Sequence, residues 1–325
     1  MRSIVTAVAL LICTNLGAFE IRPESLDGGA YDPLSSVSNI YFYSNNLANR
    51  CLKDKNYVRD GKGQPIHEAI IRIAYLKAYG STIKEQTWLS PLLGGVEWND
   101  DPEELLRKAF YYGGWRNALE FRRKIALEEK GTTIMNRSHY GDLQFLHAML
   151  PSDADQTIAL QRLRRWLEYS YRVAIGEVPY NTLRRSTPYN EFFAKVGCPS
   201  PGGRCTVLDL YDMKLHFRVK NGKPASPAML QLTLQELATG AIAHVIQDSY
   251  SAGHTRRVGG TGKLMEMYRY DDKNRAQHCM FDGGYEMNKA NIEKAIQETS
   301  NFMNMIKSGR KWEQAEPFFE DILSI

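Results

Sequence analysis

Apolar and polar positions follow a helical period along much of the chain. The stretch "SDADQTIALQRLRRWLEYSYRVAIG" opens on a Ser/Asp cap region and carries its apolar positions on one side. These positions are Leu160, Leu163, Leu167 and Ala174. "HEAIIRIAYLKAYG" has the same spacing from His67 and stops at Gly80. The pattern predicts helices over 152–176 and 67–80.

Two further stretches predict long helices in the second half. "QLTLQELATGAIAHVIQDSY", residues 231–250, is nearly apolar around its whole circumference, which indicates a central, buried helix. "MNKANIEKAIQETSNFMNMIKSG" is amphipathic and ends at Gly309. Strand signals are few: "KLHFRVKNGKPA" predicts one small hairpin turning at Asn221-Gly222. The predicted fold is mainly α, a multi-helix bundle with long loops, one of them over 19–64.

Composition favours one large globular domain. Of 325 residues 43% are apolar and 24% charged, and no shift in composition divides the chain. "MRSIVTAVALLICTNLGAFE" has the form of a secretory signal peptide, whose apolar run is too short to span a bilayer. We therefore expect a signal peptide over 1–18, a single helical domain over 19–325 and a secreted or periplasmic product. No later segment predicts a transmembrane anchor.

The net charge and the cysteines bear on nucleic-acid binding, disulfide bonds and structural zinc. A formal charge of +4 is too mild to indicate a stable nucleic-acid partner. Cys13 lies in the predicted leader, so an even number of cysteines would remain, which in an exported protein suggests disulfides. "GCPSPGGRC" makes a local Cys198–Cys205 bridge plausible and leaves Cys51 and Cys279 as the other pair. The sequence lacks a Cys-x-x-Cys pair, which argues against a zinc finger.

The histidines are the candidate metal-binding residues of this chain. The chain has 7 histidines, and "AHVIQDSYSAGH" contains two of them with an aspartate between. Positions four apart share a helix face, so His244 and Asp248 point the same way and can reach one cation. Gly253 is a natural helix end, and His254 beyond it can fold back to the same point. Imidazole combined with carboxylate is typical of zinc sites.

A second pair repeats this spacing in "QHCMFDGG", where His278 and Asp282 are again four apart. A lone histidine is more often a hydrogen-bonded core residue than a ligand, because short motifs match by chance. For two pairs together we favour the metal interpretation.

Other candidates lie upstream. His67 begins a predicted helix, and Asp100 precedes another in "WNDDP", where Asp101 with Pro102 is typical of a helix cap. This favours Asp100 as the ligand, although the two aspartates could be exchanged. "RSHYGDLQFLHAML" supplies His139 and His147; either could bind metal while the other holds it in place. His216 has no suitable neighbour in sequence and is interpreted as structural.

This ordered set resembles the zinc-dependent phospholipase C family and the related zinc-dependent single-strand nucleases. His244-x3-Asp248-x5-His254 is similar to the family's central metal motif, and His278-x3-Asp282 to the pair that follows it. "SHYGD" resembles the Ser-His-Phe/Tyr-x-Asp stretch, which points to His139. "WNDDP" and "HEAI" resemble the upstream aspartate and first-histidine motifs. The family's terminal tryptophan ligand is replaced by Phe19 at the predicted mature end.

The resemblance implies a zinc metallohydrolase that cleaves phosphodiesters with two or three zinc ions. Zinc withdraws charge from phosphoryl oxygens and lowers the pKa of water to about 7. Asp100 would bind metal and accept the water's proton, and Asp248 would bridge. We expect a phospholipase C acting on glycerophospholipids at a membrane surface. The alternatives are a zinc-dependent single-strand nuclease and a non-enzymatic exported zinc-binding protein. The oligomeric state stays open.

Overall fold

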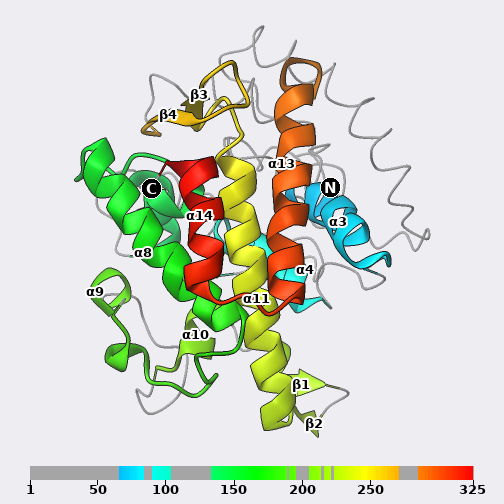
Figure 1. Ribbon diagram of the computed structural model, residues 1–325. Helices are drawn as coiled ribbons and strands as arrows, with labels where there is room; N and C mark the ends of the chain where they lie inside the picture. The colour runs from blue at the N-terminus through cyan, green and yellow to red at the C-terminus, as the bar shows by residue number, and fades with distance from the viewer. Residues whose placement is uncertain are drawn as a thin grey trace, which may run out of the picture.

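A computed structural model describes eight segments of the chain, and these are mainly helical, as predicted (Figure 1). The described residues are 66–83, 90–103, 133–188, 190–194, 205–213, 216–220, 223–270 and 285–324. The predicted signal peptide, the 19–64 loop, His278, Asp282 and all cysteines except Cys205 lie outside them. The side chain of His216 does as well.

Helices dominate the element order. The α-helices are α3 (Ile66–Tyr79), α4 (Pro91–Trp98), α7 (Ile134–Tyr140), α8 (Gln156–Ala174), α9 (Asn190–Phe193), α10 (Val207–Tyr211), α11 (Pro227–Asp248), α13 (Tyr285–Lys307) and α14 (Trp312–Leu323). Short 3-10 turns are η3 (Gln144–His147), η4 (Arg184–Ser186) and η5 (His216–Arg218). The predicted helices over 67–80 and 152–176, and the one ending at Gly309, correspond to α3, α8 and α13; the predicted 231–250 helix corresponds to α11. The sequence patterns did not predict α4 or α14.

Helix α11 is the central helix, as its apolar circumference predicts. From Leu237 to Asp248 every residue is buried, and α4, α8 and α13 pack around it (Figure 1). The helix begins four residues earlier than predicted, because Ser226 caps it by accepting from the Met229 amide and Pro227 fits the first turn. Its exposed N-terminal turns extend beyond the bundle, which leaves Leu232 60% exposed.

Two glycines let α4 and α11 approach very closely. A Cβ atom on Gly240 would overlap the backbone of Leu92 and Val96, and one on Gly95 would overlap the Leu237 carbonyl. Any larger side chain at either position would force the two helices apart. The absence of Cβ atoms therefore sets the distance at which the end of α4 meets α11.

Aromatic packing joins the crossing of α4 and α11 to the rest of the core. Trp98, the last residue of α4, stacks on Trp166 of α8 with ring centroids 5.7 Å apart. Its indole Nε1 donates to the Leu210 carbonyl at 2.8 Å, so the buried polar atom is satisfied. Trp98 also lies 5.3 Å from the ring of Tyr211 of α10, between centroids. The end of α4 is thus held by both α8 and α10. Elsewhere α13 packs against α3, and α14 packs against α8.

Two small antiparallel hairpins complete the described structure. β1 (Val219–Lys220) pairs with β2 (Lys223–Pro224), which is the predicted hairpin. β3 (Thr255–Arg257) pairs with β4 (Leu264–Met267), which the sequence did not predict. Arg257 ties this second hairpin to the end of α11: its guanidinium donates to Ser249 and lies 3.9 Å from the Tyr250 ring centroid.

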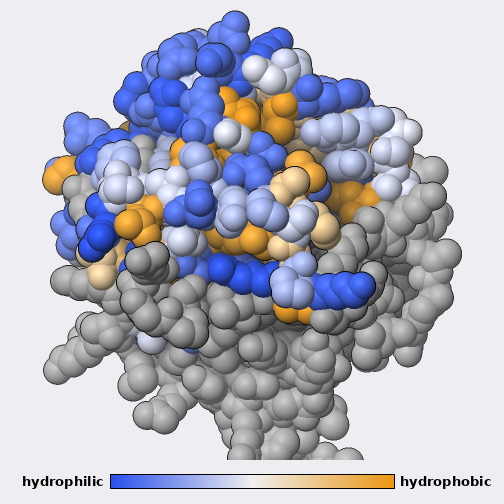
Figure 2. Space-filling model, turned by 90° about the horizontal axis from the view of Figure 1, so that it is seen from below, coloured by the Kyte–Doolittle hydropathy of each residue, from blue (hydrophilic) through white to orange (hydrophobic). Residues whose placement is uncertain are grey.

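The surface seen from below is mostly hydrophilic, with small hydrophobic patches separated by polar side chains over the described part (Figure 2). Within the described segments, every helix is too short or too polar to cross a bilayer.

Candidate metal centre

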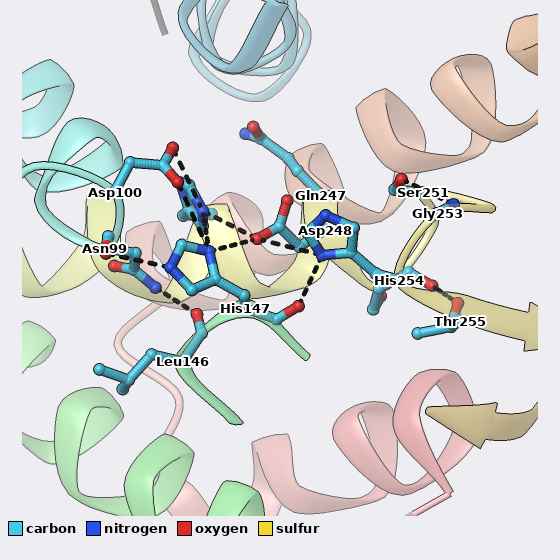
Figure 3. Close-up of polar contacts among 12 residues, drawn as sticks. Asn99, Asp100, Leu146, His147, Gln247, Asp248, Ser251, Gly253, His254 and Thr255 are labelled. Carbon is cyan, nitrogen blue, oxygen red and sulfur yellow. Dashed lines mark hydrogen bonds and ion pairs between the residues drawn. The ribbon is translucent and has the colours of Figure 1, made fainter. Parts of the chain in front are cut away.

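Every predicted ligand that falls within the described residues belongs to one largely buried cluster at the C-terminal end of α11. They are His67, Asp100, His139, His147, His244, Asp248 and His254, and all are buried except His139, which is partly buried. They come from α3, α7, α11, η3 and the segments that follow α4 and α11. Figure 3 shows Asp100, His147, Asp248 and His254 of this cluster. The predicted convergence of distant segments is therefore present in the fold.

Asp248 lies at the middle of the cluster. Its Oδ2 is 2.8 Å from His244 Nε2, 2.9 Å from His147 Nδ1 and 3.6 Å from His254 Nδ1. Its Oδ1 is 3.3 Å from His67 Nε2. The two oxygens of one carboxylate thus face imidazoles from four different parts of the chain.

Asp100 forms the second focus. Its Oδ1 lies 3.6 Å from His147 Nδ1 and 3.9 Å from His139 Nε2, and its Oδ2 lies 3.7 Å from His244 Nε2. Asp100 rather than Asp101 has these neighbours. Asn99 anchors the backbone here, because its side-chain amide donates to the Leu146 carbonyl at 2.5 Å.

Two sets of three ligand atoms are close enough to hold one cation each. His67, His244 and Asp248 form one set, and Asp100, His139 and His147 form the other; within each set the atoms lie within 4.8 Å of one another. Sequence reasoning left open which of His139 and His147 belongs here, and the fold brings in both. The sets adjoin, since His147 Nδ1 is 3.1 Å from His244 Nε2.

Three of the imidazoles are oriented by a hydrogen bond from the ring nitrogen on the far side of the cluster to a backbone carbonyl. Nδ1 of His244 donates to the Val96 carbonyl at 2.7 Å, and Nδ1 of His139 donates to the Met135 carbonyl at 2.8 Å. Nε2 of His147 bonds to the Asn99 carbonyl at 3.1 Å. A neutral imidazole has one N–H, so a proton on the outer nitrogen leaves a lone pair directed into the cluster. This outer hydrogen bond is the usual support of a metal-bound histidine.

Counting protons shows that the cluster suits a cation. When the rings are neutral and those carbonyls accept the N–H groups, His147 Nδ1 and His244 Nε2 carry lone pairs that lie 3.1 Å apart. The same two lone pairs face Asp248 Oδ2, at 2.9 and 2.8 Å. Nε2 of His139 and Oδ1 of Asp248 are buried and have no hydrogen bond within the described structure. Converging acceptors without donors are unfavourable in a buried site. A bound cation would satisfy them together.

The protonation states also match a metal site. Burial lowers the pKa of His139 and His244 to about 3, so both imidazoles are neutral near pH 7. Burial acts to raise the pKa of Asp248, but the adjacent His244 and His254 outweigh it and hold that pKa well below its usual range. Neutral imidazoles and an ionised carboxylate are the forms that bind metal.

His254 and Asp142 lie outside the two sets of three ligands. His254 directs its Nδ1 to the His147 carbonyl at 2.9 Å, so it lies beside Asp248 but belongs to neither set of three. Asp142 of "SHYGD" lies apart from the cluster and forms two hydrogen bonds with Arg137, at 2.8 and 2.6 Å. That pair braces the end of α7, which carries His139.

The sequence analysis did not identify Gln247, whose Oε1 is 2.6 Å from His67 Nδ1. Glutamine is not a common metal ligand, so its position next to Asp248 did not suggest a role in the site.

Several imidazoles with two carboxylates suit a borderline cation such as zinc better than magnesium or calcium, which prefer oxygen.

Comparison with models of known protein families, with curated proteins and with solved structures gave no match for this chain.

Proposed function

We propose that this protein is an exported zinc metallohydrolase that cleaves phosphodiester bonds, as a phospholipase C acting on glycerophospholipids. The observation that carries the proposal is that Asp248 belongs to one set of potential ligands while its Oδ2 also lies 2.9 Å from His147 of the adjoining set. A carboxylate shared in this way is what a multinuclear centre requires. The motif resemblance to the zinc-dependent phospholipase C family, including a phospholipase-C-like bundle, agrees with it.

The arrangement favours a catalytic centre over a structural zinc. A structural zinc is normally closed by four protein ligands, whereas here His and Asp side chains exceed what one closed tetrahedral ion accepts. When bound, a pair of zinc ions would supply Lewis acidity toward phosphoryl oxygens and would lower the pKa of water. One tightly held zinc per chain would support the structural alternative, and two or three would support the catalyst.

The residues of the chain would then divide the work. Asp248 would hold the two ions close together. Asp100, surrounded by His139, His147 and His244 within 4 Å, would bind metal and accept a proton from the attacking water. The carbonyls of Val96, Met135 and Asn99 would keep the imidazole lone pairs directed inward.

A single-strand nuclease is the second candidate, and one observation favours it. Tyr140 follows His139 and is partly exposed, and its ring is supported by the buried ring of Tyr270, with centroids 5.2 Å apart. Aromatic rings beside a phosphodiesterase centre can stack on unpaired bases. The mild charge of the chain favours the lipid substrate instead, because nucleic-acid binding depends on neutralising phosphates.

The test is to incubate purified protein with phosphatidylcholine vesicles and, separately, with single-stranded DNA. Each substrate is assayed alone, with a chelator, and with zinc restored after the chelator. Zinc-dependent release of diacylglycerol supports phospholipase C, and zinc-dependent cleavage of DNA alone supports the nuclease. If both substrates stay intact at full zinc loading, or if cleavage persists in chelator, the hydrolase proposal fails.

A further inference from the structure

Gln247 is fully buried on α11 directly before Asp248 and faces His67 of α3, 180 residues away in the chain. The separation between Gln247 Oε1 and His67 Nδ1 is 2.6 Å, a short hydrogen bond. An amide oxygen can only accept, so the proton lies on Nδ1 of His67. The other ring nitrogen, Nε2, then presents its lone pair 3.3 Å from Asp248 Oδ1.

The Gln247 bond differs from the other hydrogen bonds that orient these rings. Carbonyls of the backbone hold His244, His139 and His147, and their positions follow from the fold. His67 is held by a side chain instead. Its ring also stacks on His244 with centroids 4.0 Å apart and planes at 25°, so the ring plane is set while the tautomer depends on Gln247.

We propose that Gln247 is a positioning residue of the metal centre: its amide oxygen holds His67 in the Nδ1–H tautomer and thereby makes Nε2 a ligand. The inference rests on the metal centre of the proposed function and deepens it. An acceptor at this position is required, and a neutral one avoids adding a third buried carboxylate next to Asp100 and Asp248.

The test measures zinc affinity by competition with a chromogenic chelator for the wild-type chain and two variants. Gln247→Leu removes the acceptor and is expected to weaken the binding of one zinc by about 10–100-fold, the usual effect of losing such a partner. Gln247→Glu keeps an oxygen that accepts from Nδ1 and is expected to retain that zinc. Equal affinity of Gln247→Leu and wild type, or equal losses in both variants, would overturn the proposal.

Gln231→Leu is the matched control. Gln231 lies on the same helix and makes two hydrogen bonds, with the Tyr180 amide and the Val178 carbonyl, but it is far from the cluster. Its loss is expected to lower stability and leave zinc affinity unchanged. A loss of affinity in this control equal to that in Gln247→Leu would show a general effect of destabilising α11, and would also overturn the proposal.

A second measurement does not depend on how the variants fold. Long-range proton–nitrogen NMR correlations of the zinc-loaded wild type should show His67 protonated on Nδ1 and unprotonated on Nε2; the reverse assignment overturns the proposal. The zinc experiments distinguish failure of the Gln247 proposal from failure of the proposed phosphodiesterase function. A wild-type chain that binds zinc but cleaves no phosphodiester removes the proposed function alone, whereas a chain that binds no zinc removes both.

Discussion

Oδ2 of Asp248 lies 2.9 Å from Nδ1 of His147, although the two residues are 101 positions apart in the chain. His244, one helical turn before Asp248, reaches the same oxygen at 2.8 Å. The contact between Asp248 and His147 therefore joins the local motif on α11 to the set of ligands around Asp100. We expect zinc binding and hydrolytic activity to depend on the Asp248 carboxylate.

Asp248→Asn should remove most of the bound zinc and the hydrolytic activity. The substitution keeps the shape of the side chain but removes the charge of a ligand of one set that also contacts His147 of the other, so the loss of affinity should exceed the 10–100-fold typical of an outer partner. Elemental analysis after dialysis measures it. Asp153→Asn is the control, because Asp153 pairs with Arg162 at the surface. Wild-type zinc content in Asp248→Asn would contradict the shared role.

Zinc should stabilise the folded chain, whereas magnesium and calcium should not. A ligand present at 100 times its Kd adds about 2.7 kcal/mol to the free energy of unfolding, and the imidazole-rich cluster favours zinc over oxygen-preferring ions. Thermal unfolding in chelator, and then with each ion added in turn, measures this. Equal shifts with zinc and calcium would argue against a nitrogen-rich site.

The metal-free protein should lose stability as the pH falls below about 6.5. The folded pKa values of His139 and His244 are about 3, below the unfolded value of 6.5, so between these limits the unfolded state binds more protons. Each histidine should lower the free energy of unfolding by about 1.4 kcal/mol per pH unit over that window. Asp248, whose pKa is also lowered, adds to the loss only below about pH 4.

Urea unfolding in chelator at several pH values between 7 and 4 measures this slope. His139→Asn should reduce it, because one of the two titrating groups is gone. A free energy of unfolding that stays constant across the window would contradict the buried, neutral state of these imidazoles.

Gly240→Ala should destabilise the protein and weaken zinc binding together. The new methyl group would overlap the backbone of α4 and push Val96 away from His244. The hydrogen bond from His244 Nδ1 to the Val96 carbonyl would then be weakened. Overpacking of this kind costs roughly 1–3 kcal/mol. Chemical denaturation and zinc competition measure the two effects. Thr239→Ala, the neighbouring substitution on α11, adds no atom between the helices and should leave zinc affinity unchanged.

Local periodicity determined much of the fold in advance. The amphipathic pattern of α8 and α13 and the apolar circumference of α11 predict those helices, because each pattern reports how a segment buries its own side chains. Helix α4 escaped prediction: eight residues with two adjacent glycines carry little periodic signal. Gly95 matters because α11 crosses α4 at that residue, which the pattern within α4 cannot show.

The sequence alone also determined which side chains the end of α11 offers to the candidate centre, since His244 and Asp248, four positions apart, share one helix face whatever surrounds them. It could not choose between His139 and His147, or between the adjacent Asp100 and Asp101, because each choice depends on contacts with residues far away in the chain. Only the tertiary structure decided that both histidines and Asp100 converge, and that Gln247 faces His67. The reason is physical: such contacts depend on helix crossings and loop paths, and these are set by packing between segments rather than by the pattern within any one of them.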